Sequence, residues 1–194
     1  MIDTKALRQK ILDLAIRGKL VPQDPDDEPA SVLLERIRQQ KQQMVKEGKL
    51  KPKDIKNDSV IFVGEDNLHY EKFADGSVKC IEDEIPFDIP GSWAWTRIKT
   101  VSVDLPYGTS KKSNSSGKVA VLRMGNLQDG EIDYSDLVYS SDEADIEKYY
   151  LLENDLLFNR TNSAEWVGKT SIYRGDTPAI YAGYLIRIRT PLCG

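Results

Sequence analysis

The chain has 194 residues, 40% of them hydrophobic and 30% charged, which is enough for one medium-sized globular domain and a smaller appended segment. No apolar run approaches the roughly 18 residues of a membrane span, and the N-terminus lacks the apolar core of a secretion signal. The net charge of −4 argues against indiscriminate coating of nucleic acid, because nonspecific binding depends mainly on neutralising phosphates.

Two helices are predicted near the N-terminus. Residues 4–17 carry apolar side chains at helical spacing, and Asp3 is a suitable N-cap. A second helix is predicted from Pro29 to Glu47, since proline is favoured at the start of a helix and Gly48 ends the run. Its apolar stripe is thin, so we expect it to pack by one edge, against the first helix or another subunit.

The next stretch predicts a linker and then a β-hairpin. Residues 49–60 have the composition of a mobile, basic linker, and residues 1–57 hold 13 Lys and Arg against 9 Asp and Glu, a charge of +4. Asp75-Gly76, between two strand-like runs, is a strong two-residue turn signal. The large apolar side chains of Trp93 and Trp95 follow a proline-rich boundary, and we expect them in the core of the C-terminal sheet.

From there on the pattern is rich in strands, with Asp129-Gly130 as a turn and residues 142–150 as a short helix. These elements predict an α+β protein in which an N-terminal helical pair precedes a twisted mixed-sheet domain. The predicted strands are 93–99, 119–124, 131–139, 155–159, 168–174 and 180–189. The predicted divisions are a helical segment with linker (1–57), a hairpin connection (58–84) and the C-terminal domain (85–194).

Residues 106–118 read PYGTSKKSNSSGK, a polar loop beside a strand-like run. Hydroxyl and ammonium groups bond phosphate oxygens, asparagine pairs with adenine, and tyrosine stacks or donates a hydrogen bond. An ordinary flexible surface loop would explain the same composition. The candidate contact residues here are Tyr107, Thr109, Ser110, Lys111, Lys112 and Asn114.

Residues 159–165 read NRTNSAE and follow a strongly apolar strand. An arginine emerging from a strand end is well placed to bond guanine or phosphate, and the alternative is an ion pair of Arg160 with Asp155 or Glu165. Arg123 allows the same two interpretations. Arg187 and Arg189 alternate with isoleucines, the pattern of a half-buried strand with a solvated face. The candidate contact residues here are Arg160, Thr161, Asn162 and Ser163.

No catalytic set or cofactor motif is found. Gly168-Lys169-Thr170 matches only the end of a phosphate-binding loop, because Ser163 occupies the position of the first glycine and a strand-like run follows. The lone histidine, His69, has no nucleophile motif to serve, and no glycine-rich dinucleotide fingerprint follows a strand. Cys80 and Cys193 lack ligand spacing. We therefore expect no metal, no cofactor, no structural disulfide and a cytoplasmic setting.

Several motifs in order resemble one known family. The N-terminal LRQKILDLAIRGKLVPQDPDDEPASVLLERIRQQKQ, the boundary DEIPFDIPGSWAWTRI, and then YGTSKK, VLRMGNLQDGEID, ENDLLFNRTNS and VGKTSIY resemble the N-terminal half of the specificity subunit of type I restriction–modification enzymes. The match spans nearly the whole chain, and several motifs in order are more specific than any one of them. The family's subunit has two target recognition domains in tandem, separated by long helices, and each domain reads one half of a split DNA site.

The resemblance implies sequence-specific recognition of double-stranded DNA without catalysis. Modification subunits would carry the methyltransferase activity and a restriction subunit the nuclease activity. Residues 85–194 would be the first target recognition domain, which we expect to be incomplete at its C-terminal end, and the fragment could self-associate through its helices. The alternatives are a scaffold that only bridges protein subunits, and a nucleotide hydrolase that uses Gly168-Lys169-Thr170.

Overall fold

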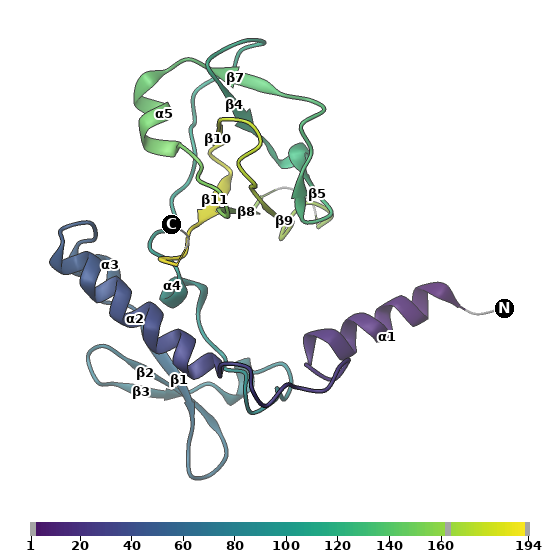
Figure 1. Cartoon of the computed structure of the whole chain (residues 1–194), viewed down its shortest axis with the longest axis vertical. Coiled ribbons are helices and arrows are strands. Elements are labelled where there is room, and N and C mark those ends of the chain that lie inside the picture. The colour runs from purple at the N-terminus through teal and green to yellow at the C-terminus, as the bar shows by residue number, and fades with distance from the viewer. Residues whose placement is uncertain (1–2, 162–163, 193–194) are drawn as a thin grey trace. The chain divides into compact units, whose positions relative to one another are not determined.

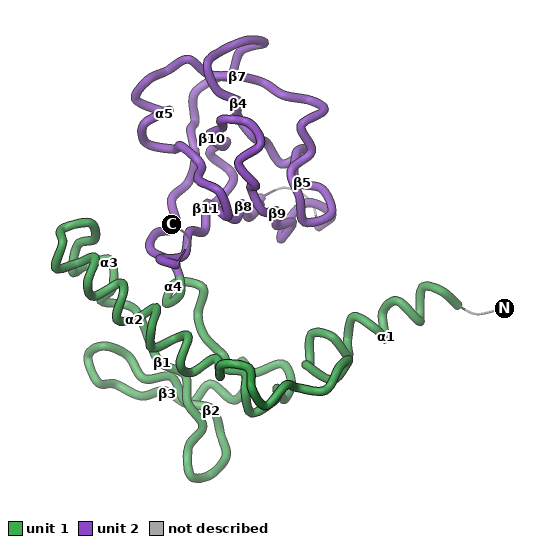
Figure 2. The backbone as a smooth tube through the Cα atoms, viewed as in Figure 1, with its two compact units in different colours: residues 1–101 green, residues 102–194 purple. Residues whose placement is uncertain are grey.

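A computed structural model describes residues 3–161 and 164–192 of the chain. The chain forms two compact units, residues 1–101 and residues 102–194, which have different colours in Figure 2. Each unit contains both helices and strands, so the α+β class predicted from the sequence is confirmed (Figure 1). The division of the chain at residues 57 and 84 stays a prediction.

The helices of unit 1 are α1 (Thr4–Ile16), α2 (Ala30–Lys46), α3 (Pro52–Ile55) and α4 (Ile98–Val101), with a 3₁₀ turn at Glu82–Glu84. The predicted N-cap of α1 is confirmed, because the Asp3 carboxylate accepts the backbone N–H groups of Lys5 and Ala6 at 3.0 and 3.1 Å. The α2 helix packs against α3 and α4, whereas Figure 1 shows α1 apart from α2.

A buried lysine joins α2 to α4. Lys41 is 1% exposed, and its ammonium group donates to the carbonyls of Lys99 and Thr100 at 3.2 and 2.9 Å. These carbonyls lie in the last turn of a short helix, where the backbone offers acceptors with no partner inside the helix. Lys41 also pairs with Asp58 at 2.5 Å, and burial lowers the pKa of Lys41 despite this partner. The predicted strand at 93–99 is therefore wrong, since its end forms α4 around this contact.

The sheet of unit 1 has the order β1 (Ser59–Val63), β2 (His69–Phe73), β3 (Val78–Cys80), all antiparallel. The hairpin predicted around Asp75-Gly76 is confirmed. The predicted mobile linker at 49–60 is wrong, because α3 and the first residues of β1 lie within it.

Trp93 and Trp95 both belong to unit 1, so the position predicted for them in the core of the C-terminal sheet is wrong. Trp93 is 42% exposed, and the Trp95 ring packs against Phe87 with ring centroids 5.3 Å apart.

Unit 2 contains a mixed sheet and an antiparallel sheet. In the mixed sheet, β4 pairs in parallel with β10 and antiparallel with β7, and in the other sheet β8 lies between β11 and β9. A short hairpin, β5 with β6, turns at Asp129-Gly130 as predicted. The elements are β4 (Val119–Leu122), a 3₁₀ turn (Met124–Asn126), β5 (Leu127–Gln128), β6 (Glu131–Ile132), β7 (Val138–Ser140), α5 (Glu143–Tyr149), β8 (Leu156–Asn159), β9 (Thr170–Ile172), β10 (Ala179–Tyr181) and β11 (Leu185–Ile188).

Two predicted strands are each divided in the structure. The region 180–189 forms β10 and β11, because a turn in which the Leu185 N–H donates to the Ala182 carbonyl at 2.9 Å leads the chain from one sheet to the other. The region 131–139 forms β6 and β7, with an intervening turn in which the Asp133 carboxylate accepts the Ser135 N–H at 2.8 Å.

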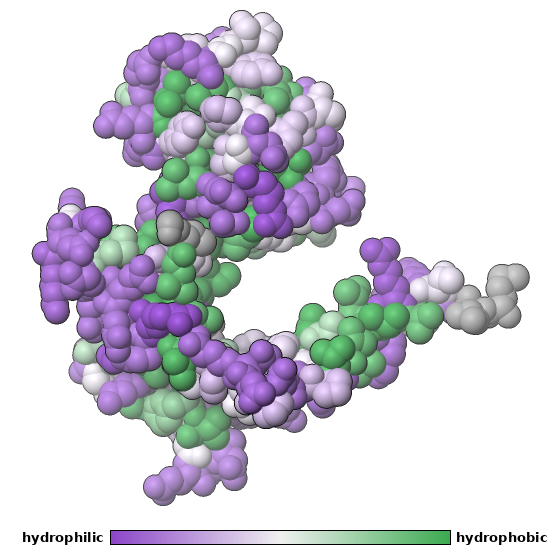
Figure 3. All heavy atoms as spheres, in the orientation of Figure 1, coloured by the Kyte–Doolittle hydropathy of each residue, from purple (hydrophilic) through white to green (hydrophobic). Residues whose placement is uncertain are grey.

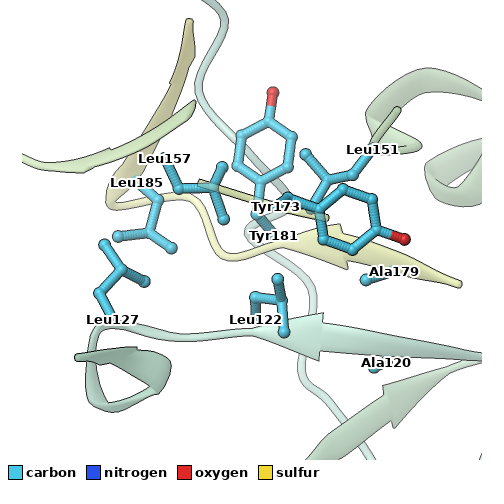
Figure 4. Close-up of a cluster of buried hydrophobic side chains, with 9 residues drawn as sticks. All are labelled: Ala120, Leu122, Leu127, Leu151, Leu157, Tyr173, Ala179, Tyr181 and Leu185. Carbon is cyan, nitrogen blue, oxygen red and sulfur yellow. The ribbon is translucent and has the colours of Figure 1, made fainter. Parts of the chain in front are cut away.

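The core of unit 2 lies between these sheets and consists of leucines, alanines and two tyrosines (Figure 4). The Tyr173 hydroxyl donates to the Thr177 carbonyl at 2.7 Å, and the Tyr181 hydroxyl donates to the Pro106 carbonyl at 3.3 Å, so both buried hydroxyls are satisfied. The members of this cluster are Ala120, Leu122, Leu127, Leu151, Leu157, Tyr173, Ala179, Tyr181 and Leu185.

The predicted solvated face of the last strand is wrong, because its arginines form ion pairs at the edge of the core. Arg187 is 5% exposed and pairs with Asp104 at 2.7 Å. Arg189 donates two hydrogen bonds, at 2.7 and 2.6 Å, to the carboxylate of Asp155, which is fully buried. An arginine whose guanidinium group is bound to a carboxylate can thus be buried at a position where the alternation of arginine and isoleucine predicted exposure to solvent.

Candidate nucleic-acid interface

One face of the antiparallel sheet of unit 2 carries a cation and an aromatic ring from distant parts of the sequence. Tyr107 lies opposite Ile186 of β11, and Ile186 lies opposite Phe158 of β8. Paired residues project to the same face of a sheet, as do residues two apart along a strand. Arg160, two residues after Phe158, therefore continues the row of side chains that contains Phe158, Ile186 and Tyr107.

The start of the first predicted loop meets the second loop on this face, whereas Asn114 at its other end pairs with Tyr139 of β7 in the mixed sheet. The Arg160 guanidinium carbon lies 4.5 Å from the centroid of the Tyr107 ring, within the range of a cation–π interaction. Arg160 and Tyr107 are both exposed, and Tyr107 is 50% exposed. The alternative pairing of Arg160 with Asp155 is wrong, because Asp155 binds Arg189. Among the described residues, no carboxylate forms an ion pair with Arg160, so its donors remain available to a ligand.

The second loop is shaped by a buried asparagine that the sequence analysis did not single out. Asn159 ends β8, is fully buried, and donates from its amide nitrogen to the carbonyls of Thr161 and Trp166 at 3.1 and 2.8 Å. The main-chain carbonyl of Asn159 accepts the backbone N–H of Gly168 at 2.8 Å. Asn159 thereby closes the loop at its base and leaves Arg160 on the outside. The available signal in the sequence was an asparagine directly after the apolar run of residues 156–158.

The remaining candidates of the second loop are only partly described. Thr161 is half-buried beside Asn159. Asn162 and Ser163 lie outside the described residues.

The first loop is anchored at its start by direct backbone packing. A Cβ atom on Gly108 would lie 2.0 Å from the Tyr181 carbonyl oxygen, so no other residue fits there without moving the backbone. The next residue, Thr109, is 5% exposed and its N–H donates to the same carbonyl at 2.9 Å. Its hydroxyl donates to the buried Asp145 carboxylate at the start of α5 and accepts the Lys111 N–H at 3.0 Å. Thr109 is thus buried and holds the first loop in shape, and its role as a DNA contact stays a prediction.

The two lysines of the first loop have different surroundings. The Lys111 ammonium pairs with Asp142 at 2.7 Å and with Asp145 at 3.2 Å, which raises the pKa of Lys111, with the hydrogen bond to Asp142 as the largest cause. The same pair lowers the pKa of Asp142. Lys112 is exposed, and no carboxylate of the described residues forms an ion pair with it. The charge of Lys111 is therefore largely compensated inside the protein, whereas that of Lys112 is not.

The other polar candidates of the first loop are accessible. Ser110 and Asn114 are exposed, and Asn114 exchanges two backbone hydrogen bonds with Tyr139 at 2.9 Å each. This pairing fixes the backbone at residue 114, so its amide side chain projects from a defined position.

Arg123 and Lys169 have partners of their own, whereas the exposed Thr170, opposite Phe158 in the β8–β9 pairing, projects to the same face as Tyr107 and Arg160. Arg123 pairs with Asp136 at 2.7 Å, as one of its two interpretations predicted. Thr170 begins strand β9 and Lys169 lies over the Trp166 ring at 4.1 Å. A phosphate-binding loop must lead into a helix whose N-terminal N–H groups face the phosphates, so the Gly168-Lys169-Thr170 sequence is not such a loop.

The described residues contain no helix long and apolar enough to cross a membrane, and no group of His, Cys, Asp and Glu side chains arranged to hold a metal ion.

No protein-family model matches the chain. Among curated proteins, it is 37% identical over 158 residues to the type I restriction enzyme EcoAI specificity subunit of Escherichia coli, an alignment that covers 79% of this chain and 23% of that protein. It is 40% identical over 102 residues to the EcoEI specificity subunit of the same species, covering 53% of this chain and 14% of that protein.

A third relative is archaeal. The chain is 31% identical over 108 residues to the putative type I restriction enzyme MjaX specificity subunit of Methanocaldococcus jannaschii, covering 54% of this chain and 25% of that protein. The chain thus spans about a quarter or less of the length of these relatives. The resemblance predicted from the ordered motifs is confirmed: the chain is similar to three type I restriction enzyme specificity subunits, at 31–40% identity over about half to 79% of its length.

Proposed function

We propose that this chain recognises a DNA sequence as part of the specificity subunit of a type I restriction–modification complex, reading one half of a bipartite site. The observation that carries the proposal is the contact between Arg160 of the second loop and Tyr107 at the start of the first loop, on one exposed sheet face. The similarity to three specificity subunits supports the same function.

In this proposal the face divides its work between base and phosphate contacts. Arg160 offers a fork of donors that fits the two acceptors of guanine, and the Tyr107 ring holds the guanidinium in place from one side. Lys112 and the Ser110 hydroxyl contact phosphates and set the position of the duplex. The amides of Asn114 and Asn162 read adenine edges. Thr109 and Lys111 hold the first loop in shape.

The chain supplies no catalytic residue in this proposal. Modification subunits carry out methyl transfer, and a restriction subunit cleaves DNA. The exposed apolar side chains of α1, among them Leu7 at 50% and Ile16 at 55% exposure, favour an additional role in docking those subunits. A chain that lacks residues 1–50 and still selects its motif would show that bridging is not its whole function.

The test is selection from a pool of random duplexes by the purified chain, followed by affinity measurements on the enriched motif. We expect the selection to enrich one short motif and Arg160→Ala to weaken binding to it about 10- to 100-fold, since a good bidentate contact contributes about 1–3 kcal/mol. Tyr107→Ala should have a smaller effect and Tyr107→Phe almost none.

Arg174→Ala is the matched control, because Arg174 is an exposed arginine of the same unit that pairs with Glu131 at 3.0 Å. It should leave binding unchanged. If no motif is enriched, or if Arg160→Ala and Arg174→Ala behave alike, the proposed function of this face is wrong.

A further inference from the structure

The densest cluster of positive charge lies in unit 1, whereas the Tyr107–Arg160 face belongs to unit 2. Unit 2, residues 102–194, has 10 Lys and Arg against 13 Asp and Glu, a net charge of −3. In unit 1, the five lysines Lys46, Lys49, Lys51, Lys53 and Lys56 lie within 11 residues that hold only two carboxylates, Glu47 and Asp54. These five lysines, at the turn from α2 into α3, are called the basic corner below.

The nearby carboxylates form their bonds with other groups and leave four of these five lysines without an ion-pair partner among the described residues. Glu47 pairs with Lys49 at 2.8 Å, and the Asp54 carboxylate accepts the backbone N–H of Lys51 at 2.8 Å. Asp58, the next carboxylate along the chain, binds the buried Lys41. Within the described part of the chain, no ion pair engages the four exposed ammonium groups of Lys46, Lys51, Lys53 and Lys56.

The backbone beneath the basic corner is fixed. Gly48 turns the chain after α2 with a positive φ of 74°, and the Lys49 N–H donates to the Met44 carbonyl at 2.9 Å. The Lys99 ammonium donates to the Asp54 carbonyl at 2.8 Å and ties α3 to the residues of α4. The lysines therefore project from a held turn rather than from a free linker, which reduces the entropy lost when they bind.

The surface around the α2–α3 turn is also mostly hydrophilic, as Figure 3 shows. No large exposed hydrophobic side chain lies between Val32 and Val60. By contrast, the lysines of α1 share their helix with exposed leucines and isoleucines. Clustered cations without apolar neighbours fit the phosphates of nucleic acid better than a protein partner, whose interface core would require apolar contact.

We propose that the basic corner is a second DNA-binding surface, which contacts backbone phosphates of duplex DNA without regard to sequence. The inference rests on the proposed function, because it assumes that duplex DNA is the partner. Its consequence is a division in which unit 1 supplies salt-sensitive affinity and the Tyr107–Arg160 face supplies sequence preference.

The experiment measures binding of the whole chain to a random-sequence duplex of fixed length over a series of salt concentrations. The quadruple variant Lys46→Gln, Lys51→Gln, Lys53→Gln, Lys56→Gln should bind at least about tenfold more weakly at low salt. The magnitude of the slope of log affinity against log salt should fall by about 3.6 if all four lysines contact phosphates, since each phosphate contact contributes roughly 0.9 to it.

The control variant removes the same charge from α1 and the residues after it: Lys5→Gln, Arg8→Gln, Lys10→Gln, Lys19→Gln. We expect it to keep the salt slope of the unmodified chain. Equal losses in the two quadruple variants would mean that overall charge matters rather than the basic corner, and no loss in the basic-corner variant would exclude a phosphate contact there. Both results overturn the proposal, as does displacement of the chain from duplex by polyglutamate more readily than by competing duplex.

The two proposals fail in different ways. The basic-corner variant should still enrich the same motif from a random pool, whereas Arg160→Ala should lose the motif and keep its salt slope nearly unchanged. If no motif is enriched but the basic-corner variant still loses affinity and salt slope as expected, only the proposed function is contradicted.

Discussion

The Arg160 end and the Lys111 end of the candidate interface hold their cations in opposite ways. Arg160 lies over an aromatic ring that leaves its charge uncompensated, while Lys111 pairs with Asp142, the N-cap of α5, and with Asp145 in the helix. A cation that lies over an aromatic ring can still bind an anionic ligand. A cation that pairs with two carboxylates is already compensated within the protein. Counting lysines and arginines in a loop therefore overestimates its attraction for phosphate.

The largest effect is expected at the start of β8, the strand that Arg160 follows. Asp155→Ala removes the partner of Arg189 at the start of β8 and leaves a largely buried guanidinium uncompensated. We expect a loss of about 3–5 kcal/mol in the free energy of unfolding, measured by denaturant titration.

Glu131→Ala provides the comparison, because it breaks the exposed pair with Arg174, where both side chains are half exposed. Its cost should lie below about 1 kcal/mol. Similar costs for the two variants would contradict the structural importance assigned to the Asp155–Arg189 pair.

A smaller effect is expected at the Lys111 end. Thr109→Val keeps the shape of the side chain but removes the donor to the buried Asp145 carboxylate, and we expect a loss of about 1–3 kcal/mol in the free energy of unfolding. Thr170→Val is the control, because its exposed hydroxyl donates to a loop carbonyl, and its cost should stay within about 0.5 kcal/mol. A cost for Thr109→Val no greater than that of the control would mean that the α5 contact does not hold the loop.

The smallest effect concerns two neighbouring lysines. Lys112→Gln should weaken binding to duplex DNA a few-fold and lower the salt slope by about 1, while Lys111→Gln should change affinity less than about twofold. The reason is that Asp142 and Asp145 compensate the charge of Lys111.

The Lys111–Asp142 pair should also respond to pH. Because its folded-state pKa is depressed below 3.8, Asp142 favours the folded state above that value, and this contribution disappears as pH falls through the depressed pKa. A titration of the Asp142 carboxyl by NMR in the intact chain and in Lys111→Gln should show the pKa rising in the variant. Equal pKa values, or a larger loss of binding for Lys111→Gln than for Lys112→Gln, would remove the distinction between the two lysines.

Local signals predicted the local parts of this structure. The Asp3 N-cap, the hairpin at Asp75-Gly76 and the short helix after Asp142 all follow from residues within a few positions of one another. The ordered motifs also pointed to the proteins that the chain is similar to, the specificity subunits of type I restriction enzymes.

The sequence failed where a side chain finds its partner far along the chain. Arg187 pairs with Asp104, 83 residues away, and Thr109 bonds Asp145, 36 residues away, so neither the burial of the arginine nor the structural role of the threonine could be read from a strand or loop pattern. The meeting of Tyr107 and Arg160 has the same origin, since it depends on how β11 lies between β8 and the segment that contains Tyr107.

The tight fit of Gly108 against the Tyr181 carbonyl has a consequence for how such proteins diversify. With residues 108 and 109 fixed by the backbone of β10 and by α5, the outward positions 110, 112 and 114 can exchange side chains while the loop keeps its path. Under the proposed function, a change of DNA sequence preference then requires substitution at a few surface positions only, without any change in the framework that supports them.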